Sequence, residues 1–148
     1  LAEVERGFAD IKQRVSRQKR KRVYFQTWPD PLITIGKASF PHWLLTAAGG
    51  INVFGDMPFD SGQINMEWII QRDPEVLIFI ARQREFVRKL FARPEWKSIR
   101  GVQRSHICFL DEADIRRSIQ FLEGLAKIHA CLYGTKQTGQ GETIGRLK

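Results

Sequence analysis

The apolar run at 76–80 (VLIFI) constrains the fold of this chain more than any other segment. Five apolar residues without polar alternation predict a strand buried on both faces, and such strands belong to parallel sheets that helices cover on both sides. Two more β-rich runs lie at 23–26 and 106–110, and 52–54 is a further candidate. Because helical segments separate these runs, the chain is predicted to adopt an α/β fold with a mainly parallel sheet of four or five strands.

The helical segments carry start and stop signals. Ser39 is expected to cap a helix that has Pro41 in its first turn and ends at Gly49-Gly50. Asn65 is expected to cap a second helix over 66–72. Further helical segments are expected at 83–91, in a short turn from residue 94, and over 115–132.

The chain divides into three segments by composition. Residues 1–22 place Val4, Phe8, Ile11 and Val15 on one face of a predicted amphipathic helix and end in the basic run 19–22. Residues 23–133 form the α/β body. Residues 134–148 contain four glycines and few apolar side chains, so we expect a flexible tail. The first residue is leucine rather than methionine, which suggests a processed or truncated product.

The net charge is unevenly distributed along the chain. The sequence has 24 Lys and Arg against 16 Asp and Glu, a formal net charge of +8, which raises the alternative of a small nucleic-acid-binding domain that uses the run at 19–22. Eight basic and three acidic residues lie within 1–22, and three basic and one acidic residue lie within 134–148. The body is therefore nearly neutral, which argues against nucleic acid as the partner of the fold itself.

Motifs of enzymes are absent from the sequence. There is no GxSxG, no phosphate-binding glycine-rich motif of the GxxxxGK[ST] type and no GxGxxG, so a flavodoxin-like enzyme lacks its expected loop. His42, His106 and His129 have no metal-ligand spacing, so we predict no metal site and no cofactor. The acidic residues at 111–114 are better explained as a solvated loop. We therefore predict that the chain is not an enzyme.

The two cysteines allow two interpretations. Cys108 lies in the predicted third strand and Cys131 in the predicted last helix, and these elements could pack against each other. A disulfide would fit an oxidising compartment, but two buried thiols are the favoured prediction.

A candidate ligand site follows from the loops after the strands. In parallel α/β sheets, ligands bind beyond the carboxyl ends of the strands. Pro29 and Pro31 are expected to end the first strand and stiffen its loop, where Trp28 offers a flat apolar face or, alternatively, only closes the edge of the core. Arg82 and Arg117 follow the other two strands, and guanidinium groups around an aromatic ring suit an anionic ligand.

Several segments, in order along the chain, resemble the C-terminal lobe of class III periplasmic substrate-binding proteins, which serve ABC importers of iron-siderophore complexes, haem and cobalamin. The similar segments are RVYF at 22–25, PLITIGKASF at 31–40, AGGINV at 48–53, NMEWIIQRDPEVLI at 65–78, WKSIRGV at 96–102, ICFL at 107–110 and LEGLA at 122–126. Arg116 stands where many relatives have a proline, and the tail after residue 134 does not match.

The resemblance implies a three-layer α/β/α lobe over 23–133, with residues 1–22 as the end of a long interdomain helix and its basic exit. The second, N-terminal lobe would be missing from this chain. Trp28, Pro31, Arg82 and Arg117 would face a ferric siderophore or related metal complex. Glu67 matches the glutamate with which this lobe docks on an ABC permease of the inner membrane, although a carboxylate in the first turn also favours the helix dipole. The implied location is periplasmic, or an extracytoplasmic lipoprotein.

Overall fold

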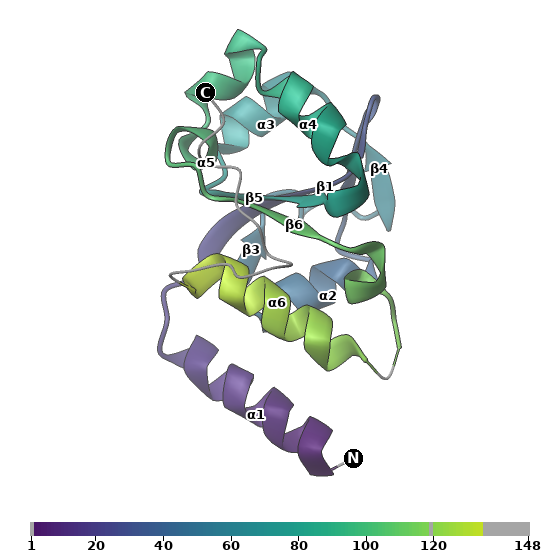
Figure 1. Cartoon of the computed structure of the whole chain (residues 1–148), viewed down its shortest axis with the longest axis vertical. Coiled ribbons are helices and arrows are strands. Elements are labelled where there is room, and N and C mark those ends of the chain that lie inside the picture. The colour runs from purple at the N-terminus through teal and green to yellow at the C-terminus, as the bar shows by residue number, and fades with distance from the viewer. Residues whose placement is uncertain (1, 119, 135–148) are drawn as a thin grey trace.

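The computed structural model describes residues 2–118 and 120–134, which form a sheet between two layers of helices (Figure 1). The strands are β1 (Lys21–Pro29), β2 (Leu32–Ile35), β3 (Gly50–Asn52), β4 (Ser61–Gln63), β5 (Val76–Ile80) and β6 (Ile107–Leu110). The α-helices are α1 (Ala2–Ser16), α2 (Phe40–Ala47), α3 (Met66–Arg72), α4 (Arg84–Leu90), α5 (Arg100–Gln103) and α6 (Phe121–Tyr133). Three short 3₁₀ helices connect them: η1 (Ala81–Gln83), η2 (Pro94–Ser98) and η3 (Glu112–Ile115).

The sheet is mixed, with a parallel centre. Its strand order is β4-β2-β1-β5-β6, and β3 also pairs with β1. The pairs β1–β3, β1–β5 and β5–β6 are parallel, whereas β1–β2 and β2–β4 are antiparallel. The predicted α/β class with a mainly parallel sheet is therefore confirmed, and an antiparallel extension is added at one edge.

Alternation along the buried strands divides the core into two parts. Val76, Ile78 and Ile80 of β5 pack on the side of α1, α2 and α6, while Leu77 and Phe79 pack on the side of α3, α4 and α5. Successive side chains of a strand point to opposite faces, so an unbroken apolar run has to be covered on both sides. This requirement explains the three layers.

The predicted helix caps at Ser39 and Asn65 are confirmed. The hydroxyl oxygen of Ser39 accepts a hydrogen bond from the backbone N–H of His42 at 3.1 Å, and Pro41 lies in the first turn of α2. The amide oxygen of Asn65 accepts a hydrogen bond from the backbone N–H of Trp68 at 2.9 Å. Both contacts satisfy donors that have no partner within the helix.

The prediction that the first strand ends before Pro29 is wrong. Strand β1 includes Pro29 and turns through the cis peptide bond Asp30-Pro31 into β2. Pro29 pairs with Leu32 at the end of this hairpin, beyond an irregularity in the register between Gln26 and Trp28. A proline is tolerated there because the end of a strand needs no donor for a continuing ladder.

The last helix also begins later than predicted. Helix α6 starts at Phe121, and the residues after β6 form the separate turn η3. The side chains of Asp111 and Asp114 cap this turn reciprocally, and Asp114 accepts a hydrogen bond from the backbone N–H of Asp111 at 3.0 Å. Because this capping box closes η3 as a separate turn, the helical segment after β6 is divided and α6 begins only at Phe121.

Cys108 and Cys131 form a disulfide, with an S–S distance of 2.14 Å, that joins β6 to α6. The prediction of two buried thiols is therefore wrong. The two elements belong to the same apolar cluster, whose packing brings the sulfur atoms together.

Helix α1 lies outside α6 and α2 (Figure 1). Ile11 and Val15 are buried, and Phe8 packs against the same cluster, as the predicted apolar stripe requires. The role of residues 1–22 as part of an interdomain helix stays a prediction. The predicted tail lies outside the described residues, apart from Gly134.

Candidate ligand-binding site

The carboxyl ends of β1 and β5 border a groove of about 410 Å³. Trp28 is the penultimate residue of β1, and η1 follows β5 directly, so the parallel pairing of the two strands places their following segments side by side. The lining residues are Trp28, Pro29, Asp30, Arg82, Gln83, Glu85, Phe86 and Lys89.

Two aromatic rings give this groove its apolar surface. Trp28 is 46% exposed and Phe86 is 42% exposed. The indole N–H of Trp28 donates a hydrogen bond to the backbone oxygen of Asp30 at 3.1 Å, which links the ring to the hairpin turn. An exposed ring with a fixed orientation provides a preformed apolar contact for a ligand.

Gln83 contributes a polar group at the base of this groove. Its side-chain amide nitrogen donates a hydrogen bond to the backbone oxygen of Thr27 at 3.0 Å. Its side-chain oxygen is buried and accepts no hydrogen bond from any described residue. A buried acceptor without a partner is costly, and a ligand N–H or O–H group would satisfy it once a side-chain movement exposes this oxygen to the groove.

The two predicted loop arginines, Arg82 and Arg117, already interact with other residues of the protein. Arg82 forms an ion pair with Glu112 at 2.9 Å, which connects the segment after β5 to the segment after β6. The guanidinium group of Arg117 lies 5.4 Å from the centre of the Phe40 ring, at the start of α2. Both side chains are exposed, and a ligand anion would compete with these two interactions for the guanidinium groups.

The structure brings together two of the four predicted ligand residues. Trp28 and Arg82 line one groove, whereas Pro31 and Arg117 do not line it. Pro31 is exposed at the hairpin turn. Gln83 and Phe86 also line the groove and were not predicted from the sequence. Gln83 immediately follows Arg82, and Phe86 lies one helical turn later, a spacing that places them near one another. The ligand roles of all four predicted residues stay predictions.

Glu67 lies elsewhere, in the first turn of α3. Its side chain is exposed and makes no hydrogen bond or ion pair with another described residue. This position is accessible to a partner protein, and its docking role stays a prediction.

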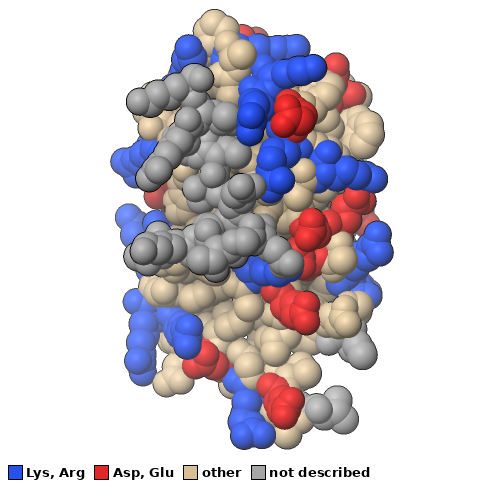
Figure 2. Space-filling model, in the orientation of Figure 1, with Lys and Arg blue, Asp and Glu red and all other residues tan. Residues whose placement is uncertain are grey.

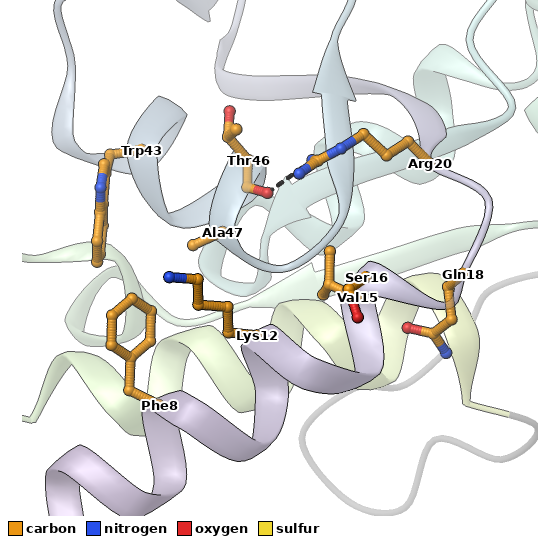
Figure 3. Close-up of a pocket in the computed structure, with 9 residues that line it drawn as sticks. All are labelled: Phe8, Lys12, Val15, Ser16, Gln18, Arg20, Trp43, Thr46 and Ala47. Carbon is orange, nitrogen blue, oxygen red and sulfur yellow. Dashed lines mark hydrogen bonds between the residues drawn. The ribbon is translucent and has the colours of Figure 1, made fainter.

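A second groove, of about 480 Å³, lies between α1 and α2 (Figure 3). Phe8 and Trp43 lie close together at one end, the ammonium group of Lys12 projects toward Ala47, and Arg20 lies at the other end. The guanidinium group of Arg20 donates hydrogen bonds to the backbone oxygens of Thr46 and Gly50. This groove was not predicted from the sequence because it depends on how α1 packs against α2.

Candidate metal ligands gather at one place among the described residues. His106, Cys108 and Cys131 offer ligand atoms within 4.8 Å of one another. His42 and His129 belong to no such group within the described part of the chain.

The surface has mixed charge. On the face shown in Figure 2, Lys and Arg side chains extend from the α1 end to the opposite end, with Asp and Glu side chains between them. Within residues 2–118 and 120–134, no helix has the length and apolar character needed to span a membrane.

Comparison with known proteins gives a consistent result. A family model described as "Periplasmic binding protein" matches residues 1–113. The chain is 33% identical over 81 residues to the vitamin B12-binding protein of Salmonella typhi, an alignment that covers 55% of this chain and 30% of that protein. A periplasmic binding protein from Veillonella parvula superposes with a TM-score of 0.82 at 19% identity, covering 92% of this chain and 50% of that one.

An ABC transporter substrate-binding protein from Listeria monocytogenes gives a TM-score of 0.80 at 19% identity, covering 89% of this chain and 55% of that one. The chain thus spans about a third to a half of the length of these proteins.

Proposed function

The chain belongs to the periplasmic binding protein family, and we propose that it forms the C-terminal lobe of the substrate-binding component of an ABC importer. The order of its elements supports this proposal, because a helix that precedes a complete α/β unit fits a connecting helix followed by the second of two lobes. An extracytoplasmic location is expected for this family, and its members work with ABC permeases and bind small metal complexes.

We propose that this lobe contributes one wall of a site for a metal complex. The proposal rests on the groove at the carboxyl ends of β1 and β5. Trp28 lines it with an exposed aromatic ring, and Gln83 lines it too, with a side-chain oxygen that has no partner among the described residues. Arg82 would interact with anionic groups of the ligand, at the expense of its ion pair with Glu112.

Among such complexes, we propose cobalamin as the ligand. Its peripheral amides carry N–H groups that can donate a hydrogen bond to the side-chain oxygen of Gln83. Its corrin ring offers apolar surface for contact with Trp28. The name of the Salmonella typhi relative supports the same choice. A ferric siderophore, which the loop arginines first suggested, is the second candidate, and haem is the third.

Equilibrium dialysis of the chain against cyanocobalamin, a ferric hydroxamate and haemin tests this proposal. We expect weak binding of cyanocobalamin, because a single lobe offers half of the contact surface. Trp28→Ala should weaken this binding about tenfold or more, since burying an aromatic side chain contributes about 1.5–3 kcal/mol.

Trp68→Ala is the matched control, because Trp68 is similarly exposed, at 39%, but lies on α3 outside the groove. Equal losses in the two variants, or no binding of any of the three complexes, would contradict the proposed site. Tighter binding of the hydroxamate or of haemin would retain the site and change the ligand.

We further propose that Glu67 docks the protein on its permease. The support is its exposure at the first turn of α3 and the absence of a competing ion pair with any described side chain. A free carboxylate at an exposed position suits an arginine of a partner protein.

A further inference from the structure

The disulfide lies beside a histidine whose position follows from the pleat of β6. His106 immediately precedes β6, and Cys108 lies two residues later, so both side chains point to the face that α6 covers. The imidazole Nε2 atom of His106 lies 2.6 Å from the backbone oxygen of Cys131. Because a carbonyl oxygen can only accept, Nε2 donates this bond and the ring is held next to the disulfide.

We propose that reduction of the Cys108–Cys131 disulfide creates a binding site for one thiophilic divalent cation, with Zn²⁺ as the natural choice. The ligands are the two sulfur atoms and a ring nitrogen of His106, which already lie within 4.8 Å of one another. A tetrahedral zinc site with these ligands places its sulfur and nitrogen atoms about 3.5–3.8 Å apart, so the elements that carry them need little movement.

The chemistry balances with a small dithiol as reductant. Two electrons and two protons pass from the dithiol to the disulfide, the S–S bond breaks, two thiols form, and the dithiol closes to its own cyclic disulfide. Binding of the cation then releases the two protons from Cys108 and Cys131, because the thiolates are the ligands.

The surroundings favour a divalent cation over a monovalent one. Both sulfur atoms lie in the apolar cluster between the sheet and α6, where a net charge is costly. Two thiolates, one neutral imidazole and one divalent cation form a neutral complex. His106 is half-buried, so its side of the site leaves room for a water molecule as the fourth ligand.

This site is separate from the groove around Trp28. His106 lies at the amino end of β6, whereas the groove borders the carboxyl ends of β1 and β5. The inference therefore does not depend on the proposed transport function. In either redox state, α6 would be joined to the sheet, by a covalent bond or through a metal ion.

Cadmium titration of the full chain tests the inference. In the experiment a phosphine replaces the dithiol as reductant: it becomes a phosphine oxide, and water supplies the oxygen atom and the two thiol protons. Cd²⁺ is then added as a spectroscopic substitute for Zn²⁺. We expect one equivalent to produce the ultraviolet charge-transfer band of cadmium–thiolate bonds, and Zn²⁺ to displace it. The oxidised chain and a Cys108→Ser, Cys131→Ser double variant should show no band.

Two histidine variants separate this site from a simple dithiol. His106→Ala should lower the affinity for Zn²⁺ at least tenfold, while leaving two reactive thiols after reduction. His129→Ala is the matched control, because His129 also lies on the α6 side but forms a hydrogen bond with Gln18 instead. The control should bind Zn²⁺ as tightly as the unmodified chain.

Three results would overturn the inference. One is a reduced chain with two reactive thiols but no charge-transfer band. Another is a His106→Ala variant with unchanged affinity. The third is a reduced chain that loses its near-ultraviolet circular dichroism and does not recover it when Zn²⁺ is added.

Discussion

Single residues determine how closely the elements of this fold approach one another. Gly124 shows this in α6, because a Cβ atom there would lie 1.7 Å from the backbone oxygen of Asp114 in η3. Gly49 has a φ of 102° and faces the ring of Tyr133. The Tyr133 hydroxyl donates to the backbone oxygen of Lys19 at 2.7 Å and lies 3.0 Å from that of Gly49. These contacts fix the position of α6 against the rest of its layer.

Gly124→Ala should lower the free energy of unfolding by about 1–3 kcal/mol, because backbone atoms of η3 have to move to admit the methyl group. Gly7→Ala is the control: the atoms nearest its Cβ would be those of the Leu122 side chain, a flexible group that can rotate away, and alanine favours a helix. Urea unfolding of both variants measures the difference. A Gly124→Ala chain as stable as the original would contradict the close approach of α6 to η3.

Protonation of His42 should make stability depend on pH. Burial lowers the pKa of His42, and its Nδ1 atom accepts a hydrogen bond from the side-chain amide of Asn52 at 3.1 Å. As the pH falls below 6.5, the unfolded chain binds a proton that the folded chain resists, so stability present above this pH is lost. The pKa of His129 is also lowered, chiefly by burial, with the same sign.

Thermal unfolding between pH 8 and pH 5 measures this effect. The melting temperature of the unmodified chain should fall on the acidic side, and His42→Gln should reduce the slope because one titrating group is removed. An identical slope in the variant would mean that His42 does not contribute.

At the scale of elements, the sequence predicts what local signals determine and misses what packing determines. The buried run of β5 and the caps Ser39 and Asn65 depend on neighbouring residues only, and they are confirmed. The β1–β2 hairpin was missed because two prolines indicate the end of a strand. The start of α6 was missed because the apolar spacing continues through η3.

Helix α1 depends on its apolar stripe, so Ile11→Ala should lower the free energy of unfolding by about 2–4 kcal/mol. Ile11 is 8% exposed and packs against the cluster under α2 and α6. Gln13→Ala, on the exposed face of the same helix, should change stability by less than about 0.5 kcal/mol. Similar stability of the two variants in urea unfolding would contradict the packing of α1 on the body.

At the scale of the whole molecule, the direction of the strands determines which residues of the groove around Trp28 could be predicted. The rule that ligands bind at carboxyl ends places Trp28 and Arg82 together, because it depends only on strand direction. It cannot predict that Arg117 lies over Phe40, since α2 approaches through tertiary packing. The disulfide was only the less favoured of two interpretations for the same reason, since the contact between β6 and α6 is also tertiary.

Docking on a permease should be separable from ligand binding. In cells that produce the complete binding protein and its permease, Glu67→Gln should slow uptake severalfold without changing ligand affinity, because only the docking charge is lost. Glu95→Gln is the control, since Glu95 is also an exposed acidic residue in the first turn of a short helix, η2. Uptake at the original rate in the Glu67 variant would exclude the docking role.

Strand β1 connects the two ends of the molecule. Just before its start, Arg20 donates hydrogen bonds to backbone oxygens of α2 and β3, and Tyr133 of α6 donates one to the backbone oxygen of Lys19. Trp28 lies near the other end of the strand. Its first half pairs with β3 and β5, and its second half pairs with β2. The strand spans roughly 26 Å, and the irregularity in its register between Gln26 and Trp28 lies close to the end that borders the groove. One continuous strand therefore joins the link that follows α1 to the aromatic ring that borders the candidate site.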